Sequence, residues 1–262
     1  MNELELREVT VCYGRGSAAQ VAVDRVDLTV RAGTTHGLVG ESGSGKSTLA
    51  RAAVGLAPTS GGQVFLGDVD VTGPSRYARR TRRRLQLVFQ DPMSALDPRL
   101  PVGASVAEGL LATGRRINRV DREARVRDLL ARVHIDPARA GELPTAFSGG
   151  QRQRITIARA LAAEPAVLIA DEITSALDVS VQGVVLNLLR ELQQDLALTV
   201  LFISHNLAVV RYVSDEVTVM RGGRVVEHGA TETVLADPAD PYTRELLRSI
   251  PVMGEPLVLE DA

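Results

Sequence analysis

Short apolar segments recur along the chain and predict strands that alternate with helices. From Leu4 to Tyr13, and again from Val21 to Val30, apolar and polar residues alternate, which predicts antiparallel strands with one solvent-exposed face. Four other segments are short and almost continuously apolar, which is typical of strands buried on both faces: Thr35–Val39, Leu85–Phe89, Ala166–Ala170 and Leu198–Ile203. Because helical patterns lie between several of these segments, the sequence predicts an α/β fold.

A long helical stretch separates the early strands from the later ones. From Val102 to Ala163 the pattern is helical, and Val120–Val133 is amphipathic and charged. We therefore expect a helical subdomain at about 91–163, inserted into one domain that spans residues 1–250 and whose last helix ends near Ile250. Prolines interrupt the mixed segment that follows, so residues 251–262 are expected to form a loose C-terminal tail.

A phosphate-binding loop is predicted between one of the buried strands and the helix after it. Residues 40–48 match the pattern G-x-x-x-x-G-K-[ST], and the expected helix starts near Thr48 and ends near Leu56. Backbone N–H groups and the positive helix end would then face one place. We expect Lys46, the only lysine of the chain, to neutralise β- and γ-phosphates, and the Ser47 hydroxyl to hold Mg²⁺. The alternative, a chance glycine-rich turn, is disfavoured by the flanking pattern. The expected loop residues are Gly40, Glu41, Ser42, Gly43, Ser44, Gly45, Lys46, Ser47 and Thr48.

A second glycine-rich helix start lies far along the chain from the first. Ser148 is a good N-cap, and Gln151 completes a capping box for a helix that runs to about Ala163. Between them, Gly149 and Gly150 each destabilise a helix by roughly 1 kcal/mol relative to alanine. One interpretation is only a well-capped helix. The other is a second anion-binding helix end, which would account for the two glycines because bare N–H groups must face a ligand.

Two carboxylates follow the buried strand at 166–170. We expect one of them, Asp171, to hold Mg²⁺, and the next, Glu172, to orient and deprotonate an attacking water. His205 follows the strand at 198–203, which is expected to lie beside the first, close to where a γ-phosphate would lie. A lone histidine is more often structural, but this position favours a functional role. The other three histidines lack such a position, and we assign no role to His36, His134 and His228.

Two further features each admit two interpretations. Tyr13, at a strand end, could stack on an adenine ring or pack against its own sheet. The arginine run at 79–84 could be a nucleic-acid patch or a solvated helix end. The second is favoured because no aromatic residues interleave with the arginines and acidic residues elsewhere balance their charge.

Composition narrows the function classes. Among 262 residues, 30 basic and 32 acidic side chains give a net charge of −2, so nothing in the overall charge suggests a nucleic-acid partner. The single cysteine, Cys12, cannot form an internal disulfide or a zinc site alone, and it fits a reducing cytosol. Glu3, Glu5 and Glu8 interrupt any signal-peptide pattern, and no apolar run is long enough to span a bilayer. A protein with this sequence that works at a membrane would dock onto the helices of another protein.

Taken in order, these residues resemble the ATP-binding subunit of ABC transporters over nearly the whole chain. Tyr13 is similar to the aromatic residue that stacks on adenine, and Gly40–Thr48 is similar to the Walker A loop. Gln90 resembles the Q-loop glutamine, which in the family touches Mg²⁺ and the attacking water and senses the transmembrane partner. The resemblance implies a P-loop NTPase core of the RecA-like type, with an N-terminal antiparallel β subdomain and an inserted helical subdomain.

The second half of the chain carries the remaining family landmarks. Ser148, Gly149, Gly150 and Gln151 resemble the signature motif. Val167–Asp171 is similar to Walker B, with Glu172 in the position of the catalytic base; Ser175–Asp178 is similar to the D-loop, and His205 to the switch histidine. One position departs from the family, because Ile173 stands where proline is usual. The turn is then less rigid, although no catalytic group is lost.

The resemblance also implies a working assembly. Two ATPase subunits, identical or different, would sandwich two ATP molecules, with Walker A of one facing the signature helix of the other. Two transmembrane permease subunits and, indirectly, an extracytoplasmic substrate-binding protein complete the set, with no nucleic acid. The subunit would be peripheral, at the cytoplasmic face of the cell membrane. The alternative is a monomeric ATPase that uses only Lys46 and Glu172.

The branch of the family is indicated by three segments. Val88–Pro98, Phe147 before the signature, and Asp240–Arg244 resemble the oligopeptide, dipeptide and nickel import branch. Several peptide-importing members carry a cysteine cluster in an extended C-terminal region, which this sequence lacks, so it is closer to shorter members that include nickel and metal-chelate importers. A soluble accessory ATPase of phosphonate metabolism, without a membrane pore, shares the branch pattern and is the alternative.

Overall fold

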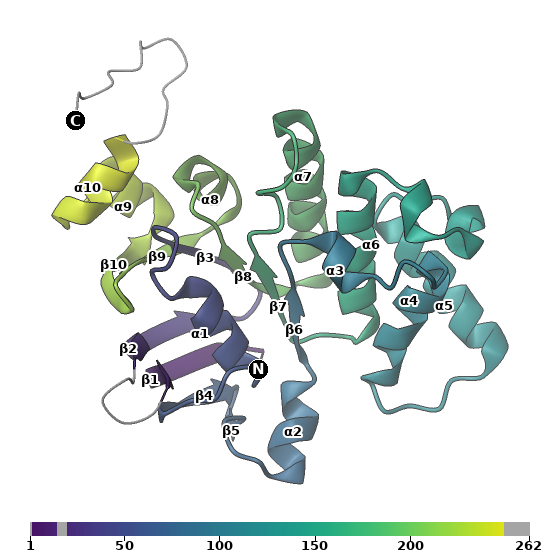
Figure 1. Ribbon diagram of the computed structural model, residues 1–262, viewed down its shortest axis with the longest axis horizontal. Helices are drawn as coiled ribbons and strands as arrows, with labels where there is room; N and C mark the ends of the chain where they lie inside the picture. Colours follow the sequence, from purple (N-terminus) through teal and green to yellow (C-terminus); the bar gives the residue numbers. More distant parts are fainter. Residues whose placement is uncertain (1, 15–19, 249–262) are drawn as a thin grey trace.

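Two β-sheets and a group of helices make up the computed structural model, which describes residues 2–14 and 20–248 (Figure 1). The expected tail at 251–262 and the expected end of the last helix near Ile250 lie outside the described residues. The structure is an α/β fold with a P-loop core, as the sequence predicts.

The first sheet is antiparallel and comes from the N-terminal part of the chain. Its strand order is β2-β1-β4-β5. The strands are β1 (Leu4–Tyr13), β2 (Gln20–Val30), β4 (Gly61–Leu66) and β5 (Val69–Asp70). Alternation of apolar and polar residues predicted β1 and β2, and their apolar side chains, such as Leu6 and Val23, are indeed buried on one face.

The second sheet carries the continuously apolar strands. Its order is β10-β9-β3-β8-β7-β6, parallel throughout except for β10, which pairs antiparallel with β9. The strands are β3 (Thr35–Val39), β6 (Leu85–Val88), β7 (Val167–Asp171), β8 (Thr199–Ile203), β9 (Glu216–Arg221) and β10 (Arg224–Ala230). In the register of β7 and β8, Asp171 lies opposite Ile203, so the residues that follow both strands meet at one edge. This neighbouring position was predicted from the sequence and is confirmed.

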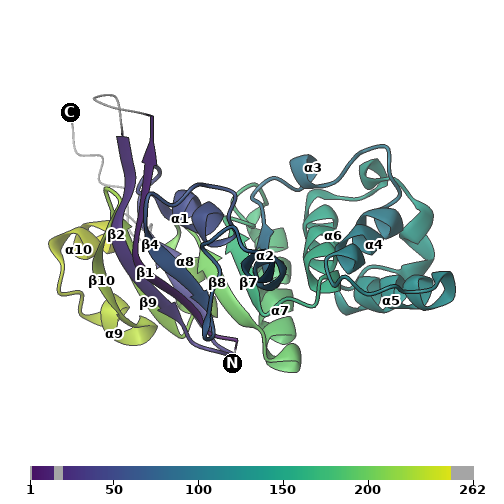
Figure 2. The same cartoon turned by 90° about the horizontal axis from the view of Figure 1, so that it is seen from below.

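Both faces of the second sheet are covered, which explains the continuous apolar runs. Along β7, Val167 and Ile169 face a core shared with α1 and the antiparallel sheet, whereas Leu168 and Ala170 face a second core built with the later helices. Figure 2 shows β1, β2 and β4 toward the end of the molecule that also carries α9 and α10, with α4, α5 and α6 at the opposite end.

Ten α-helices connect or cover the strands in the described part of the chain. They are α1 (Lys46–Ala53), α2 (Arg76–Arg82), α3 (Pro92–Ala95), α4 (Val102–Leu111), α5 (Arg119–Arg132), α6 (Gly149–Ala162), α7 (Val179–Leu196), α8 (Leu207–Val213), α9 (Thr231–Ala236) and α10 (Pro241–Arg248), with short 3-10 turns at Pro137–Gly141 and Pro144–Ala146. Helices α3 to α6 lie together beyond β6 (Figures 1 and 2). Across the part of the chain that the structure describes, no helix combines the length and the apolar character needed to cross a bilayer.

The arginine run forms α2 and the turn after it. The side-chain oxygen of Ser75 accepts the N–H of Ala78 and caps the helix. Most arginines of the run are exposed, as expected of a solvated helix end. Arg82 is different, because its guanidinium donates to the carbonyls of Val71, Thr72 and Gly73. That arginine fastens the chain between β5 and α2.

Candidate functional site

The loop that was predicted to wrap phosphates joins β3 to α1. Helix α1 begins at Lys46, two residues earlier than predicted, and Leu49 donates its N–H to the carbonyl of Gly45 at 2.9 Å, so the loop passes directly into the first helical turn. Gly40 has a φ of 150°, and a Cβ there would lie 2.1 Å from the carbonyl oxygen of Met220. Only glycine fits this position, which brings the loop against the end of β9.

Lys46 is buried at the centre of this loop. Its ammonium donates to the carbonyls of Gly40 at 2.8 Å and Glu41 at 2.7 Å. Burial lowers the pKa of Lys46, and the nearby carboxylates of Glu172 and Asp171 oppose that shift. An ammonium with little water around it interacts more strongly with an approaching anion than one in bulk solvent.

A hydrogen bond joins the start of α1 to the end of β7. The Ser47 hydroxyl donates to Asp171 Oδ1 at 2.8 Å. Asp171 ends β7 and is buried, and this burial raises its pKa; repulsion from Glu172 adds to the rise, whereas the bond from Ser47 opposes it. A hydroxyl and a carboxylate in contact are the hard oxygen donors that Mg²⁺ takes from proteins, together with phosphate oxygens and water. Over the described ranges, no group of three or more His, Cys, Asp or Glu side chains could hold a metal alone.

Glu172 and His205 meet where β7 and β8 end. His205 Nδ1 lies 3.4 Å from Glu172 Oε1, and the histidine side chain is more than half exposed while the glutamate is 17 % exposed. Glu172 has a φ of 50°, an unusual conformation for a non-glycine residue that surrounding contacts must maintain. Its N–H donates to the carbonyl of Ile203 at 2.9 Å, and its carbonyl accepts from the Ser175 hydroxyl at 2.9 Å. Hydrogen bonds and the buried side chain of Ile173 therefore fix this turn without the usual proline.

Three predicted binding residues lie at exposed positions. Tyr13 ends β1 with 43 % of its surface exposed. Gln90 follows β6 and is exposed. Asp178 precedes α7, is exposed, and makes no side-chain capping bond. Their side chains are therefore accessible to a ligand or a partner.

The second helix start has the capping box that the sequence predicts. The N–H of Ser148 donates to Gln151 Oε1 at 2.9 Å, and the N–H of Gln151 donates to Ser148 Oγ at 3.3 Å. Those two bonds leave the N–H groups of Gly149 and Gly150 without an acceptor among the residues that the structure describes.

The structure supplies a second explanation for one glycine of the pair. A Cβ on Gly150 would lie 2.2 Å from Val181 Cγ1, a side-chain methyl of α7, so packing against Val181 also accounts for this glycine. A Cβ on Gly149 would be in ordinary contact, 3.4 Å from Leu177 Cδ2. Only Gly149 remains without a packing reason.

The two helix starts do not meet within one chain. In the described ranges, no hydrogen bond or ion pair links residues 148–151 to the loop at 40–48 or to Asp171, Glu172 or His205. Helix α1 packs in one core and α6 in the other, on opposite faces of the sheet that contains β7 (Figures 1 and 2). A single chain thus assembles the first set of residues and leaves the second apart.

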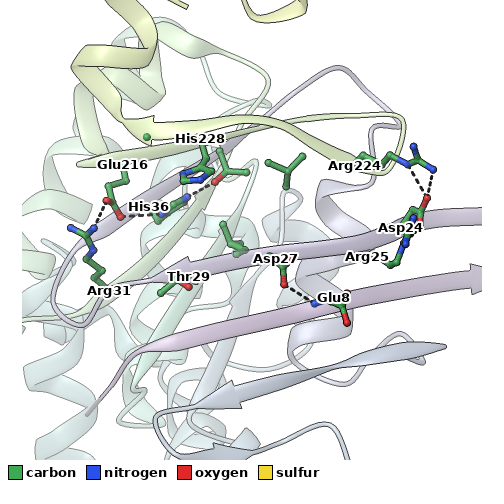
Figure 3. Close-up of a pocket in the computed structure, with 14 residues that line it drawn as sticks. Glu8, Asp24, Arg25, Asp27, Thr29, Arg31, His36, Glu216, Arg224 and His228 are labelled. Atoms are coloured by element: carbon green, nitrogen blue, oxygen red, sulfur yellow. Dashed lines mark hydrogen bonds and ion pairs between the residues drawn. The ribbon is translucent and has the colours of Figure 1, made fainter. Parts of the chain in front are cut away.

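A polar pocket of about 810 Å³ lies elsewhere, between β2 and the strands β9 and β10 (Figure 3). His36 is buried in its wall, with Nε2 2.8 Å from the Thr218 hydroxyl. Burial, together with the smaller effects of the charges on His228 and Arg31, lowers the pKa of His36 to about 4. An ion pair of 3.0 Å between Arg31 and Glu216 borders the pocket. No residue predicted to bind nucleotide lines it.

Two contacts to the loop come from the C-terminal part of the chain and were not predicted. The N–H of Gly223 donates to the carbonyl of Ser44 at 3.0 Å, and the hydroxyl of Tyr242 accepts the N–H of Glu41 at 2.9 Å. Tyr242 appeared in the sequence only as part of a branch-specific segment. No local pattern indicates a contact across two hundred residues, although a buried tyrosine normally requires a polar partner.

Comparisons with known proteins agree on the type of domain. A family model described as ABC transporter matches residues 23–175. A protein of Brucella abortus strain 2308, named as a peptide import ATP-binding protein, is 49% identical over 88% of this chain and 69% of its own length. A Brucella ovis protein with the same kind of name is 46% identical over 95% of this chain and 78% of its own length.

Solved structures of similar shape are ATP-binding cassettes. The cassette MJ0796, a dimer in a post-hydrolysis state bound to ADP and phosphate, has a TM-score of 0.77 and 27% identity, covering 87% of this chain and 98% of its own. The cbiO1 protein of Clostridium perfringens, part of the transporter complex cbiONQ, has a TM-score of 0.78 and 29% identity, covering 89% of this chain and 90% of its own.

Proposed function

This chain belongs to the ABC transporter family, and from that premise we propose that it is the ATP-hydrolysing subunit of a membrane importer whose cargo is peptides. The family membership makes it a nucleotide-binding protein that couples ATP hydrolysis to transport. The relatives named for peptide import favour an importer over the soluble phosphonate accessory protein, and they give no specific support to nickel as cargo.

One observation carries the proposal, namely the convergence of four side chains beside the glycine-rich loop. The hydrogen bond from Ser47 to Asp171 and the contact between His205 and Glu172 lie at the same edge of the parallel sheet, next to the buried ammonium of Lys46. Ligands of open α/β sheets bind outside the carboxyl ends of the strands, which is where these groups gather.

The loop would bind the phosphates of ATP. The N–H groups of residues 40–48 and the positive end of α1 suit an anion, and Lys46 would neutralise charge on the β- and γ-phosphates. Tyr13, exposed at the end of β1, would stack on the adenine ring. These contacts account for binding, and the carboxylates for the reaction that follows.

Mg²⁺ fits the oxygen donors at this edge. Ser47 and Asp171 would hold the ion together with phosphate oxygens and water, and Gln90 would approach from the end of β6. Asp171 is buried with a raised pKa, so a cation beside it would relieve the charge that burial disfavours. When bound, the ion polarises the phosphoryl oxygens and offsets their negative charge.

Glu172 would act as general base in hydrolysis. Its carboxylate takes a proton from water, the water oxygen bonds to the γ-phosphorus, and the bond to the bridging β–γ oxygen breaks, leaving ADP and phosphate. His205 lies 3.4 Å from Glu172 and would help to orient the water and the γ-phosphate. The strained backbone of Glu172, held by Ile203 and Ser175, keeps the carboxylate at this edge.

A second ATPase chain, identical or different, would complete each site. The N–H groups of Gly149 and Gly150 have no acceptor among the described residues and are separated from the loop in their own chain. They would face the γ-phosphate held by the partner. Asp178, which precedes α7, is exposed and would border the shared interface. The relative MJ0796 is a dimer, which supports this arrangement.

Membrane coupling requires other proteins, because no described helix could span a bilayer. Two transmembrane permease subunits would contact the loop after Gln90, and an extracytoplasmic binding protein would deliver the peptide. The chain would then be peripheral, at the cytoplasmic face of the membrane. Affinity purification of the chain from native membranes tests this: two integral membrane proteins should copurify. Copurification of soluble proteins alone would contradict the importer and favour an accessory ATPase.

A further inference from the structure

The mouth of the phosphate loop is closed on one side by residues from the C-terminal part of the chain. The end of β9 approaches so closely that Gly40 has no room for a side chain beside Met220, and Gly223, in the turn after β9, donates its N–H to the carbonyl of Ser44 at 3.0 Å. Helix α10, the last helix that the structure describes, also contacts the loop, through Tyr242. The loop is therefore supported by more than the strand and helix that flank it in sequence.

Tyr242 makes the contact between α10 and the loop. Its side chain is 2 % exposed, and its hydroxyl accepts the N–H of Glu41 at 2.9 Å. The guanidinium of Arg221 lies 4.6 Å from the centre of the ring. At the start of the helix, Asp240 Oδ1 accepts the N–H of Tyr242 at 2.8 Å, and the guanidinium of Arg244 donates to the carbonyl of Pro238 at 2.9 Å. The phenol is thus held in place by its own helix and by β9.

One peptide unit of the loop is bonded at both ends. The carbonyl of Gly40 accepts from the Lys46 ammonium at 2.8 Å, and the N–H of Glu41, on the other side of the same planar peptide group, donates to Tyr242 at 2.9 Å. Rotation of this plane would break both bonds together. The carbonyl of Glu41 also accepts from Lys46, at 2.7 Å, so the orientation of the ammonium depends on the same segment.

We propose that Tyr242 is a positioning residue that holds the Gly40–Glu41 peptide in the orientation needed for phosphate binding, and that it thereby couples α10 to nucleotide affinity. This inference rests on the proposed role of the loop in ATP binding. Without the hydroxyl, the Glu41 N–H loses its acceptor in a partly buried place, and other loop conformations gain population. A nucleotide then binds more weakly, in proportion to the smaller fraction of competent loop.

The coupling works in both directions. If the position of α10 alters the affinity for nucleotide, a bound nucleotide must stabilise the position of α10 by the same factor. A partner that displaces α10 would then lower the affinity for nucleotide. A change in the position of α10 would reach the loop through the contact of Tyr242 with Glu41, and a change in the β9–β10 turn through the contact of Gly223 with Ser44.

The test is Tyr242→Phe in the full chain, which keeps the ring against Arg221 and removes only the hydroxyl. The matched control is Tyr212→Phe. Tyr212 also has a guanidinium over its ring, that of Arg190 at 4.7 Å, and its hydroxyl bonds to Asn187, away from the loop. The readouts are the Kd for ADP, the KM for ATP, kcat, the melting temperature, and hydrogen exchange of the Glu41 amide and of α10 with and without ADP.

The expected result for Tyr242→Phe is a rise of about fivefold in the Kd for ADP and the KM for ATP, the equivalent of one neutral hydrogen bond, with kcat within about twofold of wild type. The Glu41 amide should exchange faster, and ADP should protect α10 less than in wild type. Tyr212→Phe should change none of these. An unchanged Kd with unchanged exchange would overturn the inference, as would a lower melting temperature alone or a fall in kcat alone. A wild-type chain that does not bind ADP would instead refute the proposed function.

Discussion

The two glycine-rich helix starts of this protein look alike in sequence and differ in structure. The first, at Gly45 and Lys46, is surrounded by polar contacts from distant segments: Asp171 on Ser47, Gly223 on Ser44, and Tyr242 on Glu41. The second, at Ser148 and Gly149, satisfies two of its N–H groups with its own capping box, leaves two without a described acceptor, and has no catalytic side chain bonded to it.

That difference indicates that the two helix starts contribute different parts of a nucleotide site. The first helix start belongs to a site whose base, hydroxyl and lysine are all in one chain. The second is capped within its own chain, and its Gly149 and Gly150 N–H groups have no acceptor among the described residues, so an anion bound there would come from outside the chain. A protein built in this way would be a poor catalyst alone and would become complete when two chains meet.

The largest effect should come from removing the base beside the first helix start. Glu172→Gln keeps the shape and the hydrogen bonds of the turn but cannot take a proton from water. Hydrolysis should fall by about a thousandfold, whereas ATP binding is retained, because binding depends on the loop. Steady-state ATPase assays and size-exclusion chromatography with ATP measure both, and the variant should elute as an ATP-dependent dimer. Glu123→Gln, an exposed carboxylate on α5, is the control. Normal turnover by Glu172→Gln would show that another base operates.

The loop cation should be next in importance. Lys46→Ala removes the ammonium that Gly40 and Glu41 hold, and kcat/KM for ATP should fall by about a hundredfold, with weaker nucleotide binding. Lys46→Arg should not restore activity, since a planar guanidinium cannot replace a compact ammonium in this buried space. Nucleotide titration and ATPase assays measure these effects. Unchanged ATPase activity in Lys46→Ala would refute the phosphate role of the loop.

At the second helix start, alanine substitutions of Gly149 and Gly150 should have different effects on stability and on ATPase activity. Gly150→Ala should destabilise the fold by about 1–3 kcal/mol, because its Cβ collides with Val181. Gly149→Ala has room for its Cβ, so the free energy of unfolding should stay the same or rise by up to about 1 kcal/mol, while ATPase activity falls about tenfold if the helix end contacts phosphate. Denaturant unfolding and ATPase assays separate the two variants. A stable Gly149→Ala with full activity would remove the functional reason for that glycine.

The smallest effect, on the melting temperature, should come from the buried carboxylate of Asp171 beside the first helix start. The pKa of Asp171 is raised above its ordinary 3.8, so the folded state holds the proton more tightly than the unfolded chain, and stability falls as pH rises through this range. At neutral pH the ionised carboxylate therefore destabilises the fold. Asp171→Asn should melt at a higher temperature than wild type at pH 7, and the difference should shrink as pH falls toward 4.

Asp178→Asn removes an exposed carboxylate from the same side of the fold and serves as the control, with no comparable gain in melting temperature. If Asp171→Asn melts lower than wild type at neutral pH, burial of this charge is not a net cost to the fold.

Much of the first helix start could be predicted from the sequence because its determinants are local. The strand, the glycines, Lys46 and the helix follow one another in the chain. The expectation that the strand before His205 lies beside the strand before Glu172 is confirmed by the pairing of β7 with β8. That neighbouring position is what brings His205 to Glu172.

The parts that escaped prediction depend on packing between distant segments. The contact of Tyr242 with Glu41 spans two hundred residues, and the absence of a side chain at Gly150 reflects the closeness of α7, which no periodicity reveals. The guanidinium of Arg82 was expected in solvent and instead bonds to backbone carbonyls, because the preceding turn folds back over it. Local patterns define elements, whereas these contacts follow from how the elements meet.

The central claim is that the two helix starts act on one nucleotide only when they come from different chains. Ser148→Arg should abolish hydrolysis yet leave nucleotide binding to the isolated chain intact, and Lys46→Ala should be inactive for the reason given above. Mixing the two inactive variants in equal amounts tests the claim directly, because a mixed pair of chains contains one site with both helix starts intact. With half of the pairs mixed and one of two sites restored in each, ATPase activity should return to about a quarter of wild type. Activity that stays at the level of the separate variants would contradict a site shared between two copies of this chain.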